Sequence, residues 1–459
     1  MKRYPKYRNS GIEWIGEIPE HWYSKKIKYL LTQKKGALKT GPFGSQLKNT
    51  ELDDKGTIKV YNQRNVLDKD FDKGIEYIND KKFEELKDFE IFDNDILITS
   101  RGTIGKCAIF PPGQKRGILH PCLIRMQINN ELVSNQWILT YINDSKLFLE
   151  NVLINSNATT IDVIYGNTLR EIVIPTPSLD EQKLILDYLD QKTKQIDALI
   201  EKKQKLIELL KEQRTAIINQ AVTKGFDPNV PMKDSGIEWL GEIPEHWEVK
   251  RIKYLLKPQK GALKTGPFGS QLKNSELDEN GKIKVYNQRN VLDSDFESGD
   301  EFINEIKFNE LKDFEIQEDD ILITSRGTIG KCEIFPKGKK RGVLHPCLIR
   351  MQINQEIALN KWVITYINES SYFNESVLLN SNATTIDVIY GNTLREVIIP
   401  TPPKDEQKII LDYIFKIINK VGKSIKNNEQ IIEKLKEYRT TLISEVVTGK
   451  IDVRDEVEQ

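Results

Sequence analysis

The sequence predicts an α+β fold in which two copies of one module are joined by two long helices, paired as an antiparallel coiled coil with pseudo-two-fold symmetry. Three observations support this prediction: an internal repeat, a long heptad pattern at the end of each copy, and a short linker between the copies. The expected boundaries are 1–177 for the first module, 178–230 for the central helical region, 231–402 for the second module and 403–459 for the C-terminal helical region.

The internal repeat is the most informative feature of the chain. The segment SGIEWIGEIPEHW at residues 10–22 returns as SGIEWLGEIPEHW at residues 235–247, an offset of 225 residues. The same offset holds without insertion through GALKTGPFGSQLKN, VYNQRNVLD, DILITSRGTIGKC, LHPCLIRMQIN and NSNATTIDVIYGNTLRE. Self-similarity of this kind means that one structural unit is written twice.

A long helix is predicted over residues 178–223. Thr193, Lys203 and Arg214 interrupt an otherwise apolar seam, and Ser178 and Glu181 have the spacing of a capping box. A helix of this length extends about 65 Å and therefore requires a partner helix. The seam residues alternate spacings of four and three, the pattern of lengthwise helix packing; they are Leu189, Ile196, Ile200, Ile207, Leu210, Ile217 and Ala221.

The second copy supplies the partner helix. Its seam continues at the same offset as far as Val446, and its polar positions Asn428 and Arg439 match those of the first helix. Two nearly identical units tend to pack about a two-fold axis. The linker 224–235 spans at most about 40 Å, so the end of the first helix must lie near the start of the second. An antiparallel pair meets this condition, whereas a parallel pair would separate these points by most of a helix length.

Each module is predicted to be an α+β unit with a curved sheet and long polar loops. Short apolar runs between Gly, Pro, Asn and Asp residues indicate strands. The expected strands are Ile58–Tyr61, Ile96–Thr99, Ala108–Phe110, Leu123–Ile128 and Ile172–Ile174, and the expected helices are Asn135–Ile142 and Lys81–Leu86.

Composition narrows the class of protein. The 459 residues contain 68 Lys plus Arg and 68 Asp plus Glu, so net charge gives no hint of a polyanionic partner. No apolar run is long enough to span a bilayer, and the start MKRYPKYRNS lacks the apolar core of a signal peptide. Four cysteines are too few for a disulfide framework in a chain of this length. We therefore expect a cytoplasmic protein with no membrane partner.

The charges are unevenly distributed. Residues 96–130 contain no acid, whereas residues 66–95 carry eleven acids against five lysines. Separation into basic loops and an acidic segment is compatible with a local nucleic-acid footprint. Solvated surface charge without function explains the pattern equally well. The positive charges of the acid-free stretch are Arg101, Lys106, Lys115, Arg116 and Arg125.

Catalytic and metal-binding motifs are missing. GTIGK at residues 102–106 departs from the Walker spacing and is better explained as a turn between two strands. Cys107, His120 and Cys122 lack a fourth ligand, so partly buried thiols beside a strand are expected instead of a metal site.

Other chemically interesting residues also favour ordinary roles. His21 and His246 are expected to pack against the tryptophan that follows each of them. Asp93 and Asp95 suggest a nuclease, but no E-x-K follows in the strand. The chain also has no N-P-P-Y or D-P-P-Y tetrapeptide of adenine methyltransferases. The chain is predicted to have no catalytic residues and no metal site.

Four polar loops in each module are suited to contacts with DNA. Asn and Gln fit the adenine edge and Arg fits the guanine edge in the major groove, while lysines and hydroxyl groups suit phosphates. A structural polar turn explains any single residue better than a DNA contact does, but both copies retain all four loops. The candidates in the first module are Lys39, Thr40, Ser45, Gln46, Lys48, Asn62, Gln63, Arg64, Asn65, Ser100, Arg101, Thr103, Lys106, Asn157, Thr159 and Thr160. Those in the second are Lys264, Thr265, Ser270, Gln271, Lys273, Asn287, Gln288, Arg289, Asn290, Ser325, Arg326, Thr328, Lys331, Asn382, Thr384 and Thr385.

Three segments resemble the specificity subunit of type I restriction-modification enzymes, and the resemblance extends over the whole chain. They are GIEWIGEIPEHW near the start, IPTPSLDEQKLILDYLDQKTKQIDALI in the centre, and IPTPPKDEQKIILDYI with EYRTTLISEVVTGKIDV at the end. The resemblance implies two target-recognition domains that alternate with two helical regions. Such a subunit reads a split double-stranded DNA sequence and docks two methyltransferase subunits, which in turn engage ATP-dependent restriction and translocase subunits. It also implies that S-adenosylmethionine, ATP and Mg bind to partner subunits, with no cofactor in this chain.

The two recognition domains are nearly the same in every candidate loop, whereas family members usually carry two dissimilar domains. We therefore predict an interrupted palindrome as the target, with half-sites about one helical turn apart. A specificity subunit whose partner fuses methyltransferase and nuclease is an alternative. A coiled-coil scaffold that binds only protein is a second alternative, and salt-dependent duplex binding would argue against it.

Overall fold

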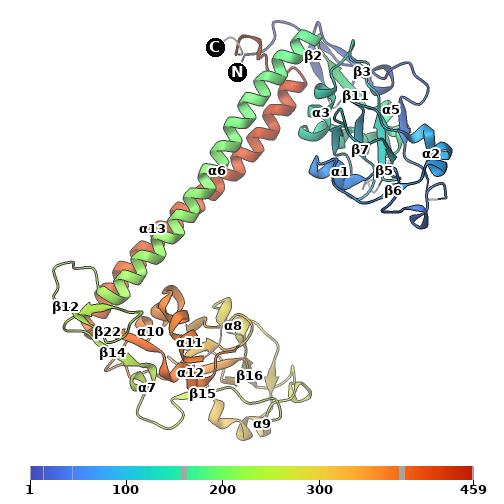
Figure 1. The fold of residues 1–459 in the computed structure, drawn as a ribbon. Helices are drawn as coiled ribbons and strands as arrows, with labels where there is room; N and C mark the ends of the chain where they lie inside the picture. Colours follow the sequence, from blue (N-terminus) through green and yellow to red (C-terminus); the bar gives the residue numbers. More distant parts are fainter. Residues whose placement is uncertain (1, 14, 44, 157–162, 382–387, 457–459) are drawn as a thin grey trace. The chain divides into compact units, whose positions relative to one another are not determined.

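The computed structural model describes residues 2–13, 15–43, 45–156, 163–381 and 388–456. It divides into two compact units, Met1–Lys203 with Glu429–Gln459 and Gln204–Asn428. Each unit therefore contains one module, the first half of the long helix that follows this module, and the second half of the other long helix. Figure 1 labels the long helices α6 and α13 and many of the strands and short helices.

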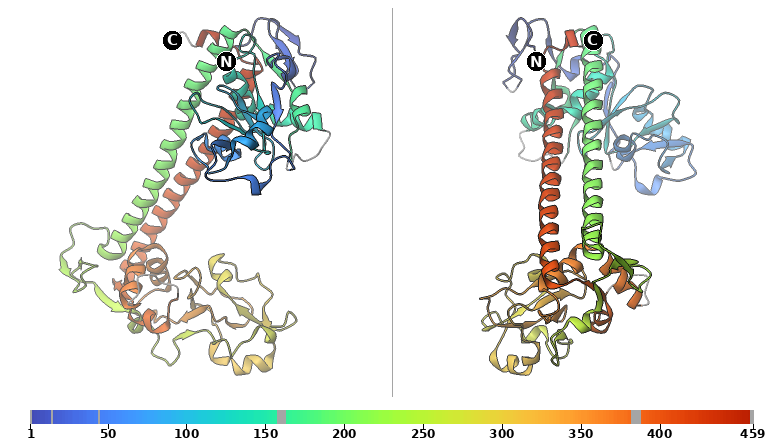
Figure 2. Two further views of the ribbon diagram at one scale, coloured as in Figure 1. Left: turned by 45° about the vertical axis from the view of Figure 1, so that its right-hand side comes forward. Right: turned by 90° about the vertical axis from the view of Figure 1, so that its left-hand side faces the viewer.

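The long helices are α6 (Leu179–Lys224) and α13 (Lys404–Val447), and they run antiparallel, as predicted. In unit 1, Ile185 and Leu189 from the start of α6 share a hydrophobic core with Leu442 and Val446 from the end of α13. Both views of Figure 2 show the paired segments side by side.

Unit 2 repeats this packing with the roles of the helices exchanged. Ala221 and Val222 from the end of α6 share a core with Ile410 and Ile414 from the start of α13. This exchange of contacts is the reciprocal relation expected of a pseudo-two-fold pair.

The start of α6 differs from the predicted capping box. The Ser178 hydroxyl accepts the backbone N–H of Glu181 at 3.3 Å, which is one half of the box. The Glu181 carboxylate accepts the Tyr4 hydroxyl at 2.9 Å and lies 2.9 Å from His21 Nε2, so the reciprocal half is not formed. His21 therefore pairs with an acid on the long helix, and His246 does the same with Glu406 at 2.7 Å. The His246 ring also packs edge-on against Trp247, with ring centroids 6.5 Å apart, as predicted.

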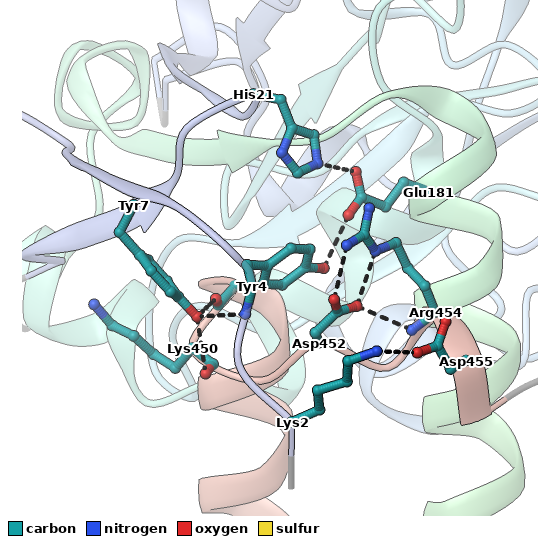
Figure 3. A network of polar contacts seen from close by, with 10 residues as sticks. Lys2, Tyr4, Tyr7, His21, Glu181, Lys450, Asp452, Arg454 and Asp455 are labelled. Atoms are coloured by element: carbon teal, nitrogen blue, oxygen red, sulfur yellow. Dashed lines mark hydrogen bonds and ion pairs between the residues drawn. The ribbon is translucent and has the colours of Figure 1, made fainter.

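The N-terminal segment and the C-terminal tail interlock around the start of α6 (Figure 3). The Tyr7 hydroxyl donates to the carbonyls of Gly449 at 3.1 Å and Lys450 at 3.3 Å, and Arg454 donates to the Asp452 carboxylate at 2.9 and 2.7 Å. At the repeat offset, residues 449–456 correspond to the linker residues 224–231. In unit 2 the chain itself runs from the end of α6 through this linker into the module. In unit 1 the equivalent C-terminal and N-terminal segments belong to opposite ends of the chain and are held together by hydrogen bonds.

A four-stranded antiparallel sheet lies at the centre of the first module, in the order β4 (Leu38–Thr40), β10 (Leu123–Met126), β7 (Ile96–Thr99), β8 (Cys107–Ile109). Its central strands β10 and β7 are fully buried, which agrees with their mostly apolar residues. Ile96 and Ile98 point into the core shared with the helices, while Leu97 points into a second core. The alternation follows from the two-residue period of a strand.

The second core lies between this sheet and a three-stranded one, ordered β6 (Tyr77–Ile78), β5 (Ile58–Tyr61), β9 (Gly117–Leu119), in which β5 and β9 are parallel. Two further pairs, β1 (Tyr7–Asn9) with β2 (Glu17–Pro19) and β3 (Tyr23–Lys26) with β11 (Val173–Thr176), lie beside the long helices. The predictions for β5 and β7 are confirmed, and those for β8, β10 and β11 differ at their ends by one or two residues.

Five short helices complete the first module. The predictions for α2 (Asp80–Leu86) and α3 (Asn135–Asp144) are confirmed within two residues at each end. The pattern missed α4 (Leu147–Ser156) and α5 (Gly166–Glu171). The segment expected as a polar loop after β5 instead begins α1 (Gln63–Asp68), because Asn62 caps its start by accepting the Arg64 N–H at 3.0 Å.

The second module repeats these elements. Its sheets have the orders β15–β21–β18–β19 and β17–β16–β20, the same as in the first module, with the pairs β12–β13 and β14–β22. The strands are β12 (Met232–Asp234), β13 (Glu242–Pro244), β14 (Glu248–Arg251), β15 (Leu263–Thr265), β16 (Ile283–Tyr286), β17 (Phe302–Ile303), β18 (Ile321–Thr324), β19 (Cys332–Ile334), β20 (Gly342–Leu344), β21 (Leu348–Met351) and β22 (Ile398–Thr401). The helices are α7 (Ile252–Leu255), α8 (Gln288–Leu292), α9 (Glu305–Glu310), α10 (Asn360–Glu369), α11 (Tyr372–Ser381) and α12 (Gly391–Glu396). Among the described residues, none of the helices combines the length and the apolar character that crossing a membrane requires.

Arg125 was expected in a basic surface but is buried, with 5% of its surface exposed. Its guanidinium donates to the carbonyls of Gly36, at 2.9 Å, and Glu90, and its Nε lies 3.7 Å from the Asp95 carboxylate. Burial raises the pKa of Asp95, against hydrogen bonds from Phe92 and Gln127 and the charge of Arg125. Arg125 therefore holds two loops and a buried acid together.

We predict that Arg125→Ala destabilises the protein by about 3–5 kcal/mol, because it leaves the buried Asp95 carboxylate without its cation. Arg116→Ala is the control, since Arg116 is half-exposed and paired with Glu90 at 2.6 Å, and exposed pairs contribute about 1 kcal/mol or less. Thermal and urea unfolding of both variants would measure the difference. Equal destabilisation by the two substitutions would contradict the assignment.

Candidate nucleic-acid interface

The described candidate loops of the first module meet at one edge of its two sheets. β4 and β7 run in the same direction, because both pair antiparallel with β10, so the loops after Thr40 and Thr99 leave the same edge. β5 and β9 are parallel and end nearby, because His120 and Cys122 connect β9 directly to β10. Topology thus gathers segments that are far apart in sequence.

Backbone contacts hold these loops against the turn of residues 120–122. The His120 N–H donates to the Tyr61 carbonyl at 2.9 Å, and the Ser100 N–H donates to the Cys122 carbonyl at 2.8 Å. Gly41 lies so close that a Cβ there would stand 2.2 Å from the His120 carbonyl oxygen. Only glycine fits at this point, so the GPFG loop is fixed by close backbone approach.

A cavity of about 370 Å³ opens between the loops after β4 and β7 and the start of α5. Two exposed aromatic rings line it, Phe43 with 66% and Tyr165 with 62% of the surface exposed. Lys39, Arg101 and Arg170 line it as well. A matching cavity of about 240 Å³ in the second module is lined by residues that include Phe268, Arg326 and Tyr390.

Sequence reasoning missed these aromatic residues, although a signal was present. Phe43 and Tyr165 lie next to glycines in repeated polar segments, where a buried partner for an aromatic ring is not expected. Exposed aromatic rings beside cations are the usual means of stacking on nucleobases.

A second cavity, of about 510 Å³, lies in the second module where α8 meets the turn after β18. Arg289, Arg326 and His345 line it, together with Gln288 and Glu301. The two turns are adjacent, since a Cβ on Gly327 would stand 3.5 Å from Gln288 Oε1. Two of the predicted loops therefore form one concave surface.

Many predicted contact residues are exposed. The side chains of Arg64, Arg101, Arg289 and Arg326 make no ion pair or hydrogen bond with any other described residue, which leaves four cationic groups free for an anionic ligand. The exposed candidates are Ser45, Gln46, Lys48, Arg64, Arg101, Thr103 and Lys106, with Ser270, Gln271, Lys273, Arg289, Arg326, Thr328 and Lys331 in the second module. The half-buried ones are Lys39, Thr40, Asn62 and Gln63, with Lys264, Thr265, Asn287 and Gln288.

Four predicted contacts are corrected, because the side chains are buried. Asn65 is 2% exposed and donates to the carbonyls of Asp70 at 2.9 Å and Lys73 at 2.8 Å. Ser100 is also buried. Their counterparts Asn290 and Ser325 are buried in the same way, and the Ser325 hydroxyl donates to the Cys347 carbonyl at 2.9 Å. These residues shape the loops and present no polar group at the surface.

Three further candidate residues in each module lie outside the described residues. They are Asn157, Thr159 and Thr160, with Asn382, Thr384 and Thr385.

Ion pairs reduce the basic surface that the acid-free stretch predicts. Arg116 pairs with Glu90 at 2.6 Å, and Arg125 is buried beside Asp95. Lys39 lies 3.2 Å from Asp88, and its counterpart Lys264 lies 3.5 Å from Asp313. Of the five cations in the acid-free stretch, Arg101, Lys106 and Lys115 therefore have no ion pair with a described residue, and all three are exposed.

The side chains on these surfaces are mainly hydrogen-bonding, cationic and aromatic groups. Over the described ranges, no group of three or more His, Cys, Asp or Glu side chains is arranged to hold a metal ion, and the cysteines are free thiols. The GTIGK segment forms a turn between β7 and β8 with positive φ at Gly102 and Gly105, as predicted. What the geometry offers is free cations, amides and aromatic rings around concave surfaces.

Known proteins are similar to this chain in sequence and in fold. The family model described as type I restriction modification DNA specificity domain matches the chain twice, over residues 19–209 and 244–437. The type I restriction enzyme MjaVIII specificity subunit of Methanocaldococcus jannaschii is 27% identical over 393 residues, which cover 83% of this chain and 85% of that protein.

Two solved structures show a similar fold. A chain from a type I R-M system, studied for its assembly and conformational transition, has a TM-score of 0.61 at 13% identity and covers 95% of this chain and 99% of its own length. The HsdS subunit from Thermoanaerobacter tengcongensis has a TM-score of 0.54 at 14% identity, covering 95% and 98%. Both family matches include a module and most of the long helix that follows it, so the chain belongs to the family of type I restriction-modification DNA specificity proteins.

Proposed function

We propose that this specificity subunit reads a bipartite double-stranded DNA target, one half-site with each module. The observation that carries the proposal is the recurrence, in both modules, of the same unpaired arginines on the same edge of the same sheets. Arg64 and Arg101 in one module correspond to Arg289 and Arg326 in the other. Free guanidinium groups suit base edges and phosphates alike.

The near-identity of the loops supports an interrupted palindrome as the target. Equal recognition surfaces select equal half-sites, and each unit packs the start of one long helix against the end of the other. Two inverted readers on one duplex require the same half-site on opposite strands. The helices would then set the length of the nonspecific spacer.

The long helices also carry surface that suits partner proteins. Ile431 and Tyr438 in unit 1, and Leu209, Ile409 and Phe415 in unit 2, are large apolar side chains on exposed helix faces. We infer that these faces dock two methyltransferase subunits, which in turn engage restriction and translocase subunits. S-adenosylmethionine, ATP and Mg would bind to those partners, and catalysis would be theirs.

Methylation mapping tests the palindrome. The chain is expressed with its cognate methyltransferase subunit, and methyladenine positions are mapped across the host genome. We expect one short half-site, present on opposite strands across a spacer of constant length. Two unrelated half-sites would contradict the palindrome while leaving bipartite recognition intact.

We predict that Arg64→Ala and Arg289→Ala relax specificity at one position of each half-site, at a cost of about 1–3 kcal/mol for the preferred base. Arg116→Ala and Arg341→Ala are matched controls, because these exposed arginines already pair with Glu90 at 2.6 Å and Glu315 at 2.7 Å. Duplex competition at several salt concentrations measures both effects. Uniform weakening with a shallower salt dependence would assign Arg64 to a phosphate instead.

A further inference from the structure

The turn between the two sheets contains a histidine and a cysteine within hydrogen-bond distance of each other, in both modules. His120 Nδ1 lies 2.9 Å from the Cys122 sulfur, and His345 Nδ1 lies 2.9 Å from the Cys347 sulfur. The turn lies where the candidate loops converge, and the sequence alone indicated only partly buried thiols there. The hydrogen-bonding contacts of each ring among the described residues involve Nδ1 and leave Nε2 to be accounted for.

The hydrogen bonds fix the tautomer of the ring. The backbone N–H of Cys347 donates to His345 Nδ1 at 3.2 Å, so this nitrogen is an acceptor and carries no proton. The backbone of Gln288 hydrogen-bonds the Cys347 sulfur, which leaves the S–H to point at the ring. Burial raises the pKa of the Cys347 thiol and lowers the pKa of His345, which keeps the thiol protonated and the ring neutral. The single ring proton therefore resides on Nε2.

This Nε2–H has no hydrogen-bond partner among the described residues. His345 lines the cavity of about 510 Å³, together with Arg289 and Arg326. The cavity thus presents three donor side chains with no acceptor of their own. Glu301 is its one acidic residue, and a carboxylate oxygen of Glu301 already accepts the Asn287 amide at 3.0 Å.

We propose that His120 and His345 each read a guanine in the major groove by donating a hydrogen bond from Nε2–H to N7. The inference rests on the proposed function. In the major groove guanine presents two neighbouring acceptors, N7 and O6. Adenine presents one acceptor, N7, beside the donor N6 amino group, and thymine presents the single acceptor O4. The donors that line the cavity match the two acceptors of guanine: the histidine donates to N7, and one of the two arginines donates to O6.

The test replaces one atom of the DNA. The full chain with its methyltransferase subunit is bound to duplexes in which 7-deazaguanine replaces each half-site guanine in turn, which removes N7 and keeps O6. We expect the wild-type affinity to fall about tenfold at one position of each half-site. No loss at any position, or half-sites without guanine, would overturn the inference.

Substitution of the histidine tests whether its Nε2–H is the group that donates to guanine N7. His120→Asn with His345→Asn keeps an amide near Nδ1 but does not reach the Nε2 position, whereas Gln carries a donor about that far. The Asn variant should be indifferent to 7-deazaguanine, within about twofold, and the Gln variant should retain sensitivity. If the Asn variant loses as much affinity on the modified duplex as the wild type does, His345 is not the donor.

Each module also serves as the control for the other. His120→Asn alone should remove the sensitivity at one half-site and leave it unchanged at the other. A variant that fails to fold would be recognised by its thermal unfolding midpoint, and the wild-type measurement on modified DNA would still decide. If the wild-type complex shows no sequence preference, the proposed function fails; if the preference survives every 7-deazaguanine, only the histidine inference fails.

Discussion

The structure depends on the burial of each long helix's apolar seam against the other helix. An isolated long helix leaves its apolar seam in contact with water. Leu189 of α6 and Ile414 of α13 are buried in cores to which the other long helix also contributes. The antiparallel pairing solves this problem twice, since each unit joins the start of one helix to the end of the other. Arg439 and Arg214 extend the pairing to the modules, through Asp144 at 3.7 Å and through Glu369.

Much of this architecture could be predicted from the sequence because it follows from periodicity and connectivity. The heptad seam, the repeat offset and the short linker together specify two antiparallel helices. The capping box at Ser178 was wrong in one half, because Glu181 has a better partner in Tyr4, which lies far away in the sequence. Likewise α1 was missed because its start depends on the Asn62 side chain and not on an apolar pattern. A prediction from a local sequence pattern fails where a side chain has a stronger polar contact elsewhere in the fold.

The candidate site was predictable in outline and not in detail. The repeated polar loops could be found in the sequence, and the structure places those that it describes at one edge of the sheets, but residue type does not reveal which side chains face inward. Asn65 and Ser100 have the chemistry of base contacts, yet they are buried in the framework of their loops. Phe43 and Tyr165 have the chemistry of core residues, yet they are exposed. The protonated nitrogen of His120 could be assigned only from the structure, in which the Cys122 backbone N–H donates to Nδ1 at 3.2 Å.

The distribution of ion pairs explains how a chain with no net charge can recognise a polyanion. Arg116, Arg125 and Lys39 lie in the same module as Arg101, and each of them has a carboxylate within 4 Å. Arg101 and Arg64 have none among the described residues, although acids are as numerous as bases in this chain. An exposed cation without an ion pair does not stabilise the fold by charge pairing, so it can bind an anionic ligand without first breaking such a pair. Because charges and hydrogen-bond donors both act over short distances in salt solution, a few exposed cations near one sheet edge can contact a ligand locally although the whole chain has no net charge.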